Sequence, residues 1–170
     1  MTPSLAAAAT LVALTLLGAA SARAQEAHGK GGIDILAGLE GGGTGYAKGV
    51  RRSRTALRFA GEAWVDEDPT HQLAVGALVE LEPVASFGAD VRYQLRPSDT
   101  IVLGAGATAV IAPKYMLGAT FGFGYRLRVS ETVELNFSPS ANVYFWGSDL
   151  PTNTVLWQAM LGVGARVDLF

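Results

Sequence analysis

Apolar and polar residues alternate along most of the chain, most clearly in MLGATFGFGYRLRV at residues 116–129. Large apolar side chains such as Leu117, Phe121 and Leu127 occupy the odd positions. Glycine, threonine and arginine occupy the even positions, as at Arg126. Because successive side chains of a β-strand point to opposite faces, this alternation predicts a strand with one apolar and one polar face.

Eight segments share this alternation, and in all of them the apolar residues fall on odd numbers. The segments are IDILAGL, TALRFAGEAWV, QLAVGALVEL, ASFGADVRYQL, IVLGAGATAVI, the run above, TVELNFSPSANVYFW and TVLWQAMLGVGARVDLF. A constant phase requires an odd number of residues in each hairpin loop. Three-residue loops at 82–84, 112–114 and 130–132 and a five-residue loop at 96–100 meet this requirement. Pro139 lies inside the seventh segment, where proline predicts a bulge or a strand end.

Residues 1–24 resemble a secretory signal peptide, with an apolar stretch from Leu5 to Ala20 and a cleavage-like Ala-Arg-Ala before Gln25. Cleavage there leaves 146 residues (170 − 24), divided into an N-terminal tail at 25–31 and a strand-rich domain at 32–170. Each of eight strands with its loop then has about 18 residues (146/8). A tilted membrane-spanning β-strand needs ~9–11 residues, so the chain is long enough for eight of them.

Glycine distinguishes two architectures that both give a two-faced strand. In a soluble lipocalin-like barrel the odd face forms the core and the even face meets water, whereas in an outer-membrane barrel the odd face meets lipid and the even face lines the lumen. Only Gly61 falls on the odd phase of the strands. Ten glycines fall on the even phase: Gly38, Gly76, Gly88, Gly104, Gly106, Gly118, Gly122, Gly124, Gly162 and Gly164. A solvent-facing strand position gains nothing from glycine, but a narrow lumen needs small residues beside arginine and tyrosine.

We therefore predict an all-β protein, an eight-stranded antiparallel up-and-down transmembrane β-barrel. A signal peptide, eight alternating strands and a terminal aromatic residue resemble the small eight-stranded outer-membrane barrels of the OmpA/OmpX type, over Gly32 to Phe170. The resemblance implies the outer membrane of a Gram-negative cell, periplasmic chain ends and insertion by the barrel-assembly machinery. Such barrels usually carry hydrophobic residues two and four positions before the terminal Phe, where this chain has Asp168 and Arg166. The alternative is a soluble periplasmic lipocalin-like barrel that binds a small apolar ligand.

The even phase also carries charges of both signs. The acids and bases are Asp34, Glu62, Glu80, Asp90, Glu134 and Asp168 with Arg58, Arg92, Arg126, Arg128 and Arg166. An unpaired buried charge is costly, so we expect salt bridges that plug the lumen and hold the barrel shape. The alternative is a narrow ion channel, although eight strands leave no continuous aqueous path in most geometries.

A glycine-rich loop after the first segment holds four basic residues, Lys48, Arg51, Arg52 and Arg54. With periplasmic chain ends, this loop falls on the outer surface, where lipopolysaccharide phosphates lie. Arginine is suited to two-pronged contact with phosphate, so the loop predicts contact with lipopolysaccharide. The alternative is a solvated loop without a ligand.

Candidate chemistry is sparse. The chain has no cysteine, which excludes disulfides and thiolate metal sites. Its two histidines, His28 and His71, lie in the N-terminal tail and at a turn, with no serine nucleophile placed near either on a strand. The acidic run at 66–68 is expected to be a solvated turn, and a net charge of −2 gives no reason to expect nucleic acid. We predict a protein without enzymatic activity, cofactor or metal, with a structural or surface-interaction role.

Overall fold

The computed structural model describes residues 29–44, 50–65, 70–82, 85–148, 150 and 154–169. The predicted signal peptide, His28, Lys48 and the acidic run at 66–68 lie outside the described residues. The backbone of Arg51 and Arg52 belongs to a strand, and their side chains lie outside what is described.

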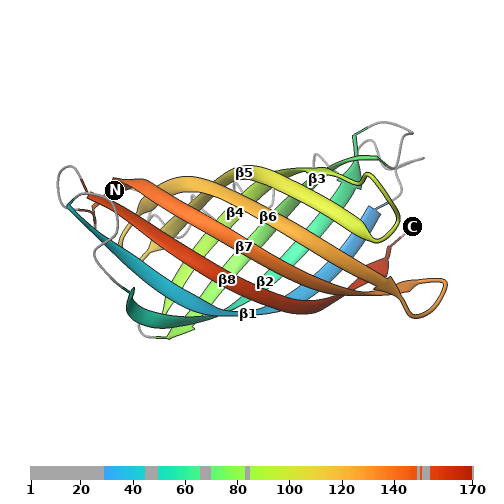
Figure 1. Ribbon diagram of the computed structural model, residues 1–170, viewed down its shortest axis with the longest axis horizontal. Helices are drawn as coiled ribbons and strands as arrows, with labels where there is room; N and C mark the ends of the chain where they lie inside the picture. The colour runs from blue at the N-terminus through green and yellow to red at the C-terminus, as the bar shows by residue number, and fades with distance from the viewer. Residues whose placement is uncertain are drawn as a thin grey trace, which may run out of the picture.

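Eight antiparallel strands form one closed barrel in which every strand pairs with its neighbours in the sequence (Figure 1). The strands are β1 (Gly29–Thr44), β2 (Val50–Trp64), β3 (His71–Glu82), β4 (Ser86–Leu95), β5 (Ile101–Ala112), β6 (Met116–Arg128), β7 (Val133–Gly147) and β8 (Thr154–Asp168). The described residues contain no helix long and apolar enough to cross a membrane. The predicted fold class, an all-β eight-stranded up-and-down barrel, is confirmed.

The first and last strands close the barrel. Lys30 pairs with Asp168 at one end of the β1–β8 ladder, and Thr44 pairs with Thr154 at the other. The start of β1 and the end of β8 therefore lie side by side at the rim that also holds the β4–β5 and β6–β7 connections, on the right in Figure 1. We call this end the chain-end rim and the opposite end the far rim.

The hairpins fall where the constant phase predicts them. Glu80 pairs with Ser86, so the next facing positions, 81 and 85, enclose a three-residue loop. Val110 pairs with Met116, so positions 111 and 115 likewise enclose three residues. The N–H of Val129 donates to the carbonyl of Val133 at 2.9 Å, which encloses residues 130–132. β4 ends at Leu95 and β5 begins at Ile101, as the five-residue loop requires.

Pro139 corrects the prediction that proline ends or bulges the seventh strand. β7 runs through Pro139, which pairs in register with Leu161 of β8. The bulge on the β6–β7 ladder lies instead near the far rim, between Leu117 and Gly118 of β6. On the β6 side Pro139 has no partner in the ladder, because pairing passes from Gly122–Ser140 directly to Tyr125–Phe137. Proline is tolerated here because the hydrogen bond it cannot donate is missing from the ladder on that side.

The two phases of the strands lie on opposite sides of the wall. Apolar side chains on odd positions point outward, and Ile35, Phe121 and Leu161 expose 60%, 53% and 55% of their surface. Most of the charged side chains on even positions are buried inside the barrel. The soluble lipocalin-like alternative placed the odd residues in the core, so that alternative is wrong.

Candidate functional site

The candidate site is the lumen, where charged side chains from seven of the eight strands meet. β1, β2, β3, β4, β6, β7 and β8 supply them, whereas the inward positions of β5 carry only small or apolar residues. The charges fall into three groups along the barrel axis, one in the middle and one near each rim. Each group contains both signs.

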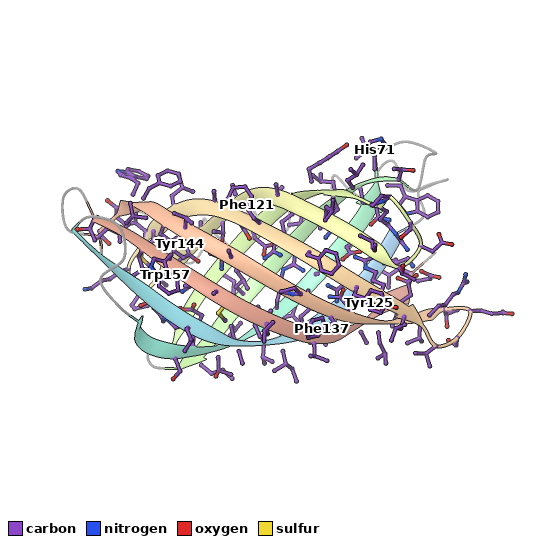
Figure 2. All side chains as sticks on the ribbon, in the orientation of Figure 1. His71, Phe121, Tyr125, Phe137, Tyr144 and Trp157 are labelled. Carbon is purple, nitrogen blue, oxygen red and sulfur yellow. The ribbon has the colours of Figure 1, made fainter. Side chains whose placement is uncertain are left out.

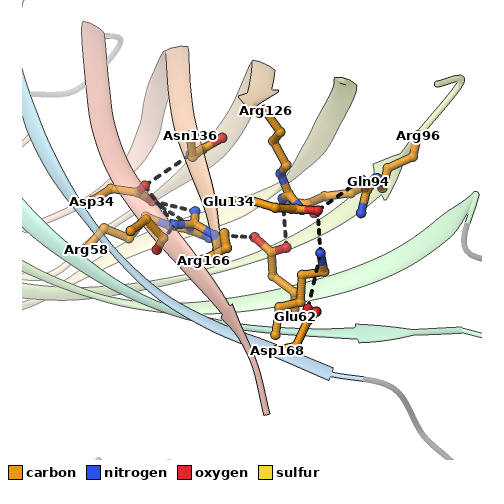
Figure 3. Close-up of polar contacts among 12 residues, drawn as sticks. Asp34, Arg58, Glu62, Gln94, Arg96, Arg126, Glu134, Asn136, Arg166 and Asp168 are labelled. Carbon is orange, nitrogen blue, oxygen red and sulfur yellow. Dashed lines mark hydrogen bonds and ion pairs between the residues drawn. The ribbon is translucent and has the colours of Figure 1, made fainter. Parts of the chain in front are cut away.

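Arg166 is the centre of the middle group (Figure 3). Its Nη1 and Nη2 atoms donate to the two oxygens of Asp34 at 2.8 and 2.7 Å, and its Nε donates to Glu62 at 2.8 Å. Arg126 donates to the other oxygen of Glu62 at 2.7 Å. The amide of Asn136 donates to Asp34 at 3.1 Å. The two carboxylates therefore each accept from Arg166 and from a side chain on another strand.

Asp90 extends the middle group across the barrel. Arg58 donates two hydrogen bonds of 2.8 Å to its two carboxylate oxygens, in the fork geometry that suits a guanidinium and a carboxylate. Arg92 donates to Asp90 at 2.8 Å, and Arg58 also lies 3.4 Å from Asp34. Residues from β1, β2, β4, β6, β7 and β8 thus form one connected network.

A second group lies toward the far rim and corrects the role predicted for Arg54. Its guanidinium is buried, with Nε 2.7 Å from Glu40 and Nη1 3.0 Å from Glu80. The amide of Gln158 donates to both of these carboxylates at 3.2 Å, and Ser86 donates to Glu80 at 2.6 Å. Arg54 therefore belongs to the lumen and not to an exposed lipopolysaccharide-binding loop, because β2 begins at Val50, earlier than the alternation indicated.

A third group lies at the chain-end rim. Lys30 contacts Glu134 at 2.6 Å and Asp168 at 3.3 Å, and Arg96 lies 3.7 Å from Glu134. Arg128 was predicted to join the lumen network and does not. It is exposed at the end of β6, where it donates to the carbonyls of residues 130 and 131 at 3.2 and 2.8 Å, because the wall ends there.

The structure adds lumen residues that the sequence analysis missed: Lys30, Glu40, Arg54, Arg96, Asn136 and Gln158. All six carry even numbers, and Lys30, Glu40, Arg54, Asn136 and Gln158 lie within strands, so the alternation indicated an inward position for these five. Extending each strand to its full length would have placed Glu40 and Arg54 inside.

The inward glycines make room for two kinds of neighbour. A Cβ atom on Gly76 would lie 2.6 Å from the Asp90 carboxylate, so this glycine gives a charged group space, as predicted. At Gly106 the obstacle is instead the backbone, since a Cβ would lie 1.9 Å from a carbonyl oxygen of β4. Gly164 combines both, because its Cβ would lie 2.1 Å from the carbonyl oxygen of Ile33 and 2.3 Å from the Asp34 carboxylate.

The lumen leaves little free space among the described residues. A cavity of about 30 Å³ lies in the middle group, and the residues that line it include Arg92, Arg126, Gly104 and Gly122. A water molecule needs roughly 10–15 Å³, so the cavity has room for about two. The Nε atoms of both arginines have no protein partner, which makes them suitable donors to such water.

Groups that could carry catalysis are not assembled in the described part of the chain. His71 lies at the start of β3, where its Nδ1 atom is hydrogen-bonded to the hydroxyl of Tyr93. Within the described ranges, no three histidine, aspartate or glutamate side chains are placed to hold a metal ion. The chemistry of this lumen is therefore that of ion pairs and hydrogen bonds.

Comparison with solved structures identifies the same architecture elsewhere. Neisserial surface protein A matches with a TM-score of 0.61 and 15% identity, over 85% of this chain and all of its own. Ail, the attachment invasion locus protein of Yersinia pestis, matches with a TM-score of 0.47 and 12% identity, over 81% of this chain and 98% of its own. No family model and no curated protein matches the chain. The first likeness confirms the predicted resemblance to small eight-stranded outer-membrane barrels at the level of the fold.

Proposed function

We propose that the protein is an integral barrel of the Gram-negative outer membrane, with a lumen that salt bridges close to ions. The observation that carries this proposal is the polarity of the wall. Apolar side chains face outward around the barrel, and a connected ionic network fills its inside. In water such a surface would promote aggregation, whereas in a bilayer it is the surface that a spanning barrel needs.

Aromatic residues near both rims also support a barrel that spans a bilayer. Tyr115 and Trp146 pack edge to face near the far rim, with ring centroids 5.6 Å apart. Figure 2 shows Trp157 toward the far rim and Tyr125 toward the chain-end rim, with Phe121 between them. A strand that advances about 3.3 Å per residue at a tilt of about 40° climbs about 20 Å along the barrel axis between Leu117 and Tyr125. This height is close to the apolar band of ~25 Å that aromatic girdles flank in membrane barrels.

The closed lumen argues for a structural or surface-interaction role and against conduction. Breaking a buried ion pair typically costs about 3–5 kcal/mol, so opening a path through the middle group is unfavourable. Cell fractionation should recover the mature chain, beginning at Gln25, in the outer membrane, with heat-modifiable migration on a gel. Recovery as a soluble periplasmic protein would refute the location. Conductance steps from the purified protein in planar bilayers would refute the closed lumen in favour of a channel.

The proposed contact with lipopolysaccharide involves three basic residues near the far rim. Lys48 falls in the sequence between β1 and β2, and Arg51 and Arg52 belong to the start of β2, whose beginning lies at the end of the barrel opposite the chain ends. With the chain ends in the periplasm, these three residues meet the phosphates of lipopolysaccharide, and contact there forms part of the proposal. A variant with all three changed to serine should bind lipopolysaccharide micelles more weakly in low salt. Arg128→Ser, which removes an exposed base at the chain-end rim, is the matched control, and equal binding by both variants would refute the contact.

A further inference from the structure

The outer wall of the barrel has an open apolar groove of about 620 Å³ across β5, β6 and β7, extending to the end of β4. We call it the β5–β7 groove and define it by Leu103, Ala105, Phe121, Phe123, Pro139 and Ala141. It lies on the outward face of the sheet, away from the lumen network described above.

Small outward residues and an interrupted ladder produce the groove. Phe121 pairs with Ala105 on β5 and with Ala141 on β7, so a large side chain stands between two small ones. Pro139 faces Phe123 across the interrupted part of the β6–β7 ladder. Beneath the groove, Gly104 and Gly122 present no side chains, and they also border the small lumen cavity. The floor of the groove is therefore largely backbone, beside Ser140, which lines both the groove and the lumen cavity.

The groove suits a hydrocarbon chain better than another protein. No charged side chain lines it, and the Tyr93 hydroxyl lies at the chain-end rim, where it is hydrogen-bonded to His71. Eleven residues line the groove, whereas a stable protein interface engages about 20–30 residues on each side. The occupant therefore needs apolar contact along a narrow path and few polar partners.

The position of the groove identifies the leaflet. It begins at Tyr93 and Leu95, near the chain-end rim where β4 ends, and reaches Ala141 in the middle of β7. We propose that the β5–β7 groove is a preferential seat for one acyl chain of a phospholipid from the periplasmic leaflet. This proposal rests on the proposed outer-membrane function, because the chain-end rim faces the periplasm only in that orientation.

Photolabelling tests the seat directly. The protein is refolded into phospholipid vesicles that contain a phospholipid with a diazirine on its acyl chain, irradiated, digested and mapped by mass spectrometry. Outward residues of β1, β2 and β3, such as Ile35, Phe59 and Val75, provide the comparison wall on the same molecule. We expect several-fold more label per exposed residue in the groove segments than on the comparison wall. Equal labelling of the two walls would overturn the proposal.

Two alanine-to-phenylalanine variants distinguish a specific seat for an acyl chain from general lipid contact. Ala105→Phe fills the groove, and its label there should fall to the level of the comparison wall. Ala37→Phe makes the same change at an exposed outward alanine of β1 and should leave the groove label unchanged. Groove labelling that survives Ala105→Phe would contradict the seat. Heat-modifiable migration checks that each variant is folded.

Other outcomes bear on the occupant and on the proposed function separately. Because the natural chain has no cysteine, Ala141→Cys can report contact between two copies by disulfide formation in the vesicles. Efficient disulfide-linked dimers would assign the groove to self-association and overturn the lipid seat, leaving the membrane location intact. A wild-type chain that neither inserts nor shows heat-modifiable migration would overturn the proposed function and the seat with it.

Discussion

Two glycines on the inner face of the barrel should respond in opposite ways to the same small substitution. A Cβ atom on Gly106 would lie 1.9 Å from the carbonyl oxygen of Val91 and 2.8 Å from the Cα of Arg92, both backbone atoms of β4. A Cβ atom on Gly122 would lie 3.5 Å from Nη1 of Arg92 and 3.6 Å from the carbonyl oxygen of Pro139, which is ordinary contact. Gly106→Ala therefore requires the backbone to move, and Gly122→Ala does not.

The size of the difference follows from two opposing effects. Replacing glycine by alanine at a compatible position stabilises a protein by about 0.4–1 kcal/mol, because the unfolded chain loses conformational freedom. Forcing extra atoms into a filled space typically costs about 1–3 kcal/mol, and occasionally more. Both variants receive the first effect and only Gly106→Ala receives the second. Gly106→Ala should therefore be less stable than Gly122→Ala by about 1–3 kcal/mol.

Urea unfolding in detergent micelles measures this difference, with tryptophan fluorescence and heat-modifiable migration as two independent signals. Equal free energies of unfolding for the two variants, or a lower value for Gly122→Ala, would refute the reasoning. Gly122→Leu provides a further check, because its Cβ fits while the rest of the side chain meets Arg92 and a cavity of only about 30 Å³. We expect this variant to refold in lower yield than wild type, and a wild-type yield would contradict the assignment of Gly122 to the lumen.

Five further variants test the two faces of the wall and its rim. Arg166→Ala removes hydrogen bonds to two buried carboxylates and should destabilise the barrel by about 3–5 kcal/mol in urea unfolding. Arg126→Ala should cost less, because Glu62 keeps Arg166, and Glu134, which lies 3.7 Å from Arg126, keeps Lys30. Arg128→Ala, at an exposed rim position, should change stability by no more than about 0.5 kcal/mol, and a larger loss would return this residue to the lumen network. Phe121→Arg places a charge near the middle of the apolar band and should cost about 2–4 kcal/mol when refolding into vesicles is measured, so a wild-type free energy would count against a lipid-facing position. Gly61→Ala should stabilise by about 0.5–1 kcal/mol, since a Cβ there contacts nothing within 4 Å, and a loss of stability would show an unseen neighbour.

The alternation predicted the barrel well because it records a constraint that acts at almost every position. A strand in this wall has lipid on one side and the lumen on the other, so the polarity of each residue indicates the side that it faces. Ile35, Phe59 and Leu161 are outward and Asp34, Arg58 and Gly162 inward, in agreement with their odd and even numbers. The faces could therefore be assigned without knowing which strands pair.

The partners inside the lumen could not be predicted in the same way. They depend on the stagger between strands, which the alternation does not record. Arg166 reaches Glu62, a contact that no spacing along the chain indicates. Strand length was the second gap, because Arg54 and Arg128 lie near strand ends where the pattern does not say how far the wall extends. The prediction that Pro139 ends or bulges its strand was wrong because the sequence does not show which neighbouring ladder a proline interrupts. Here only the ladder with β6 is interrupted, and the ladder with β8 continues.

The charged lumen has a structural consequence that an apolar filling would not give. Side chains alternate with a period of two, so a one-residue slip of a strand moves every side chain to the other face. If both faces of β8 were apolar, such a slip would change little. With Arg166 and Gln158 on the inner face, a slip would place a guanidinium and an amide against lipid and would leave Asp34 without its partner. The ion pairs add little net stability, because desolvation offsets much of their attraction. Their larger effect is to make the wrong registers unfavourable, and this effect acts on every strand that contributes a charged residue to the network.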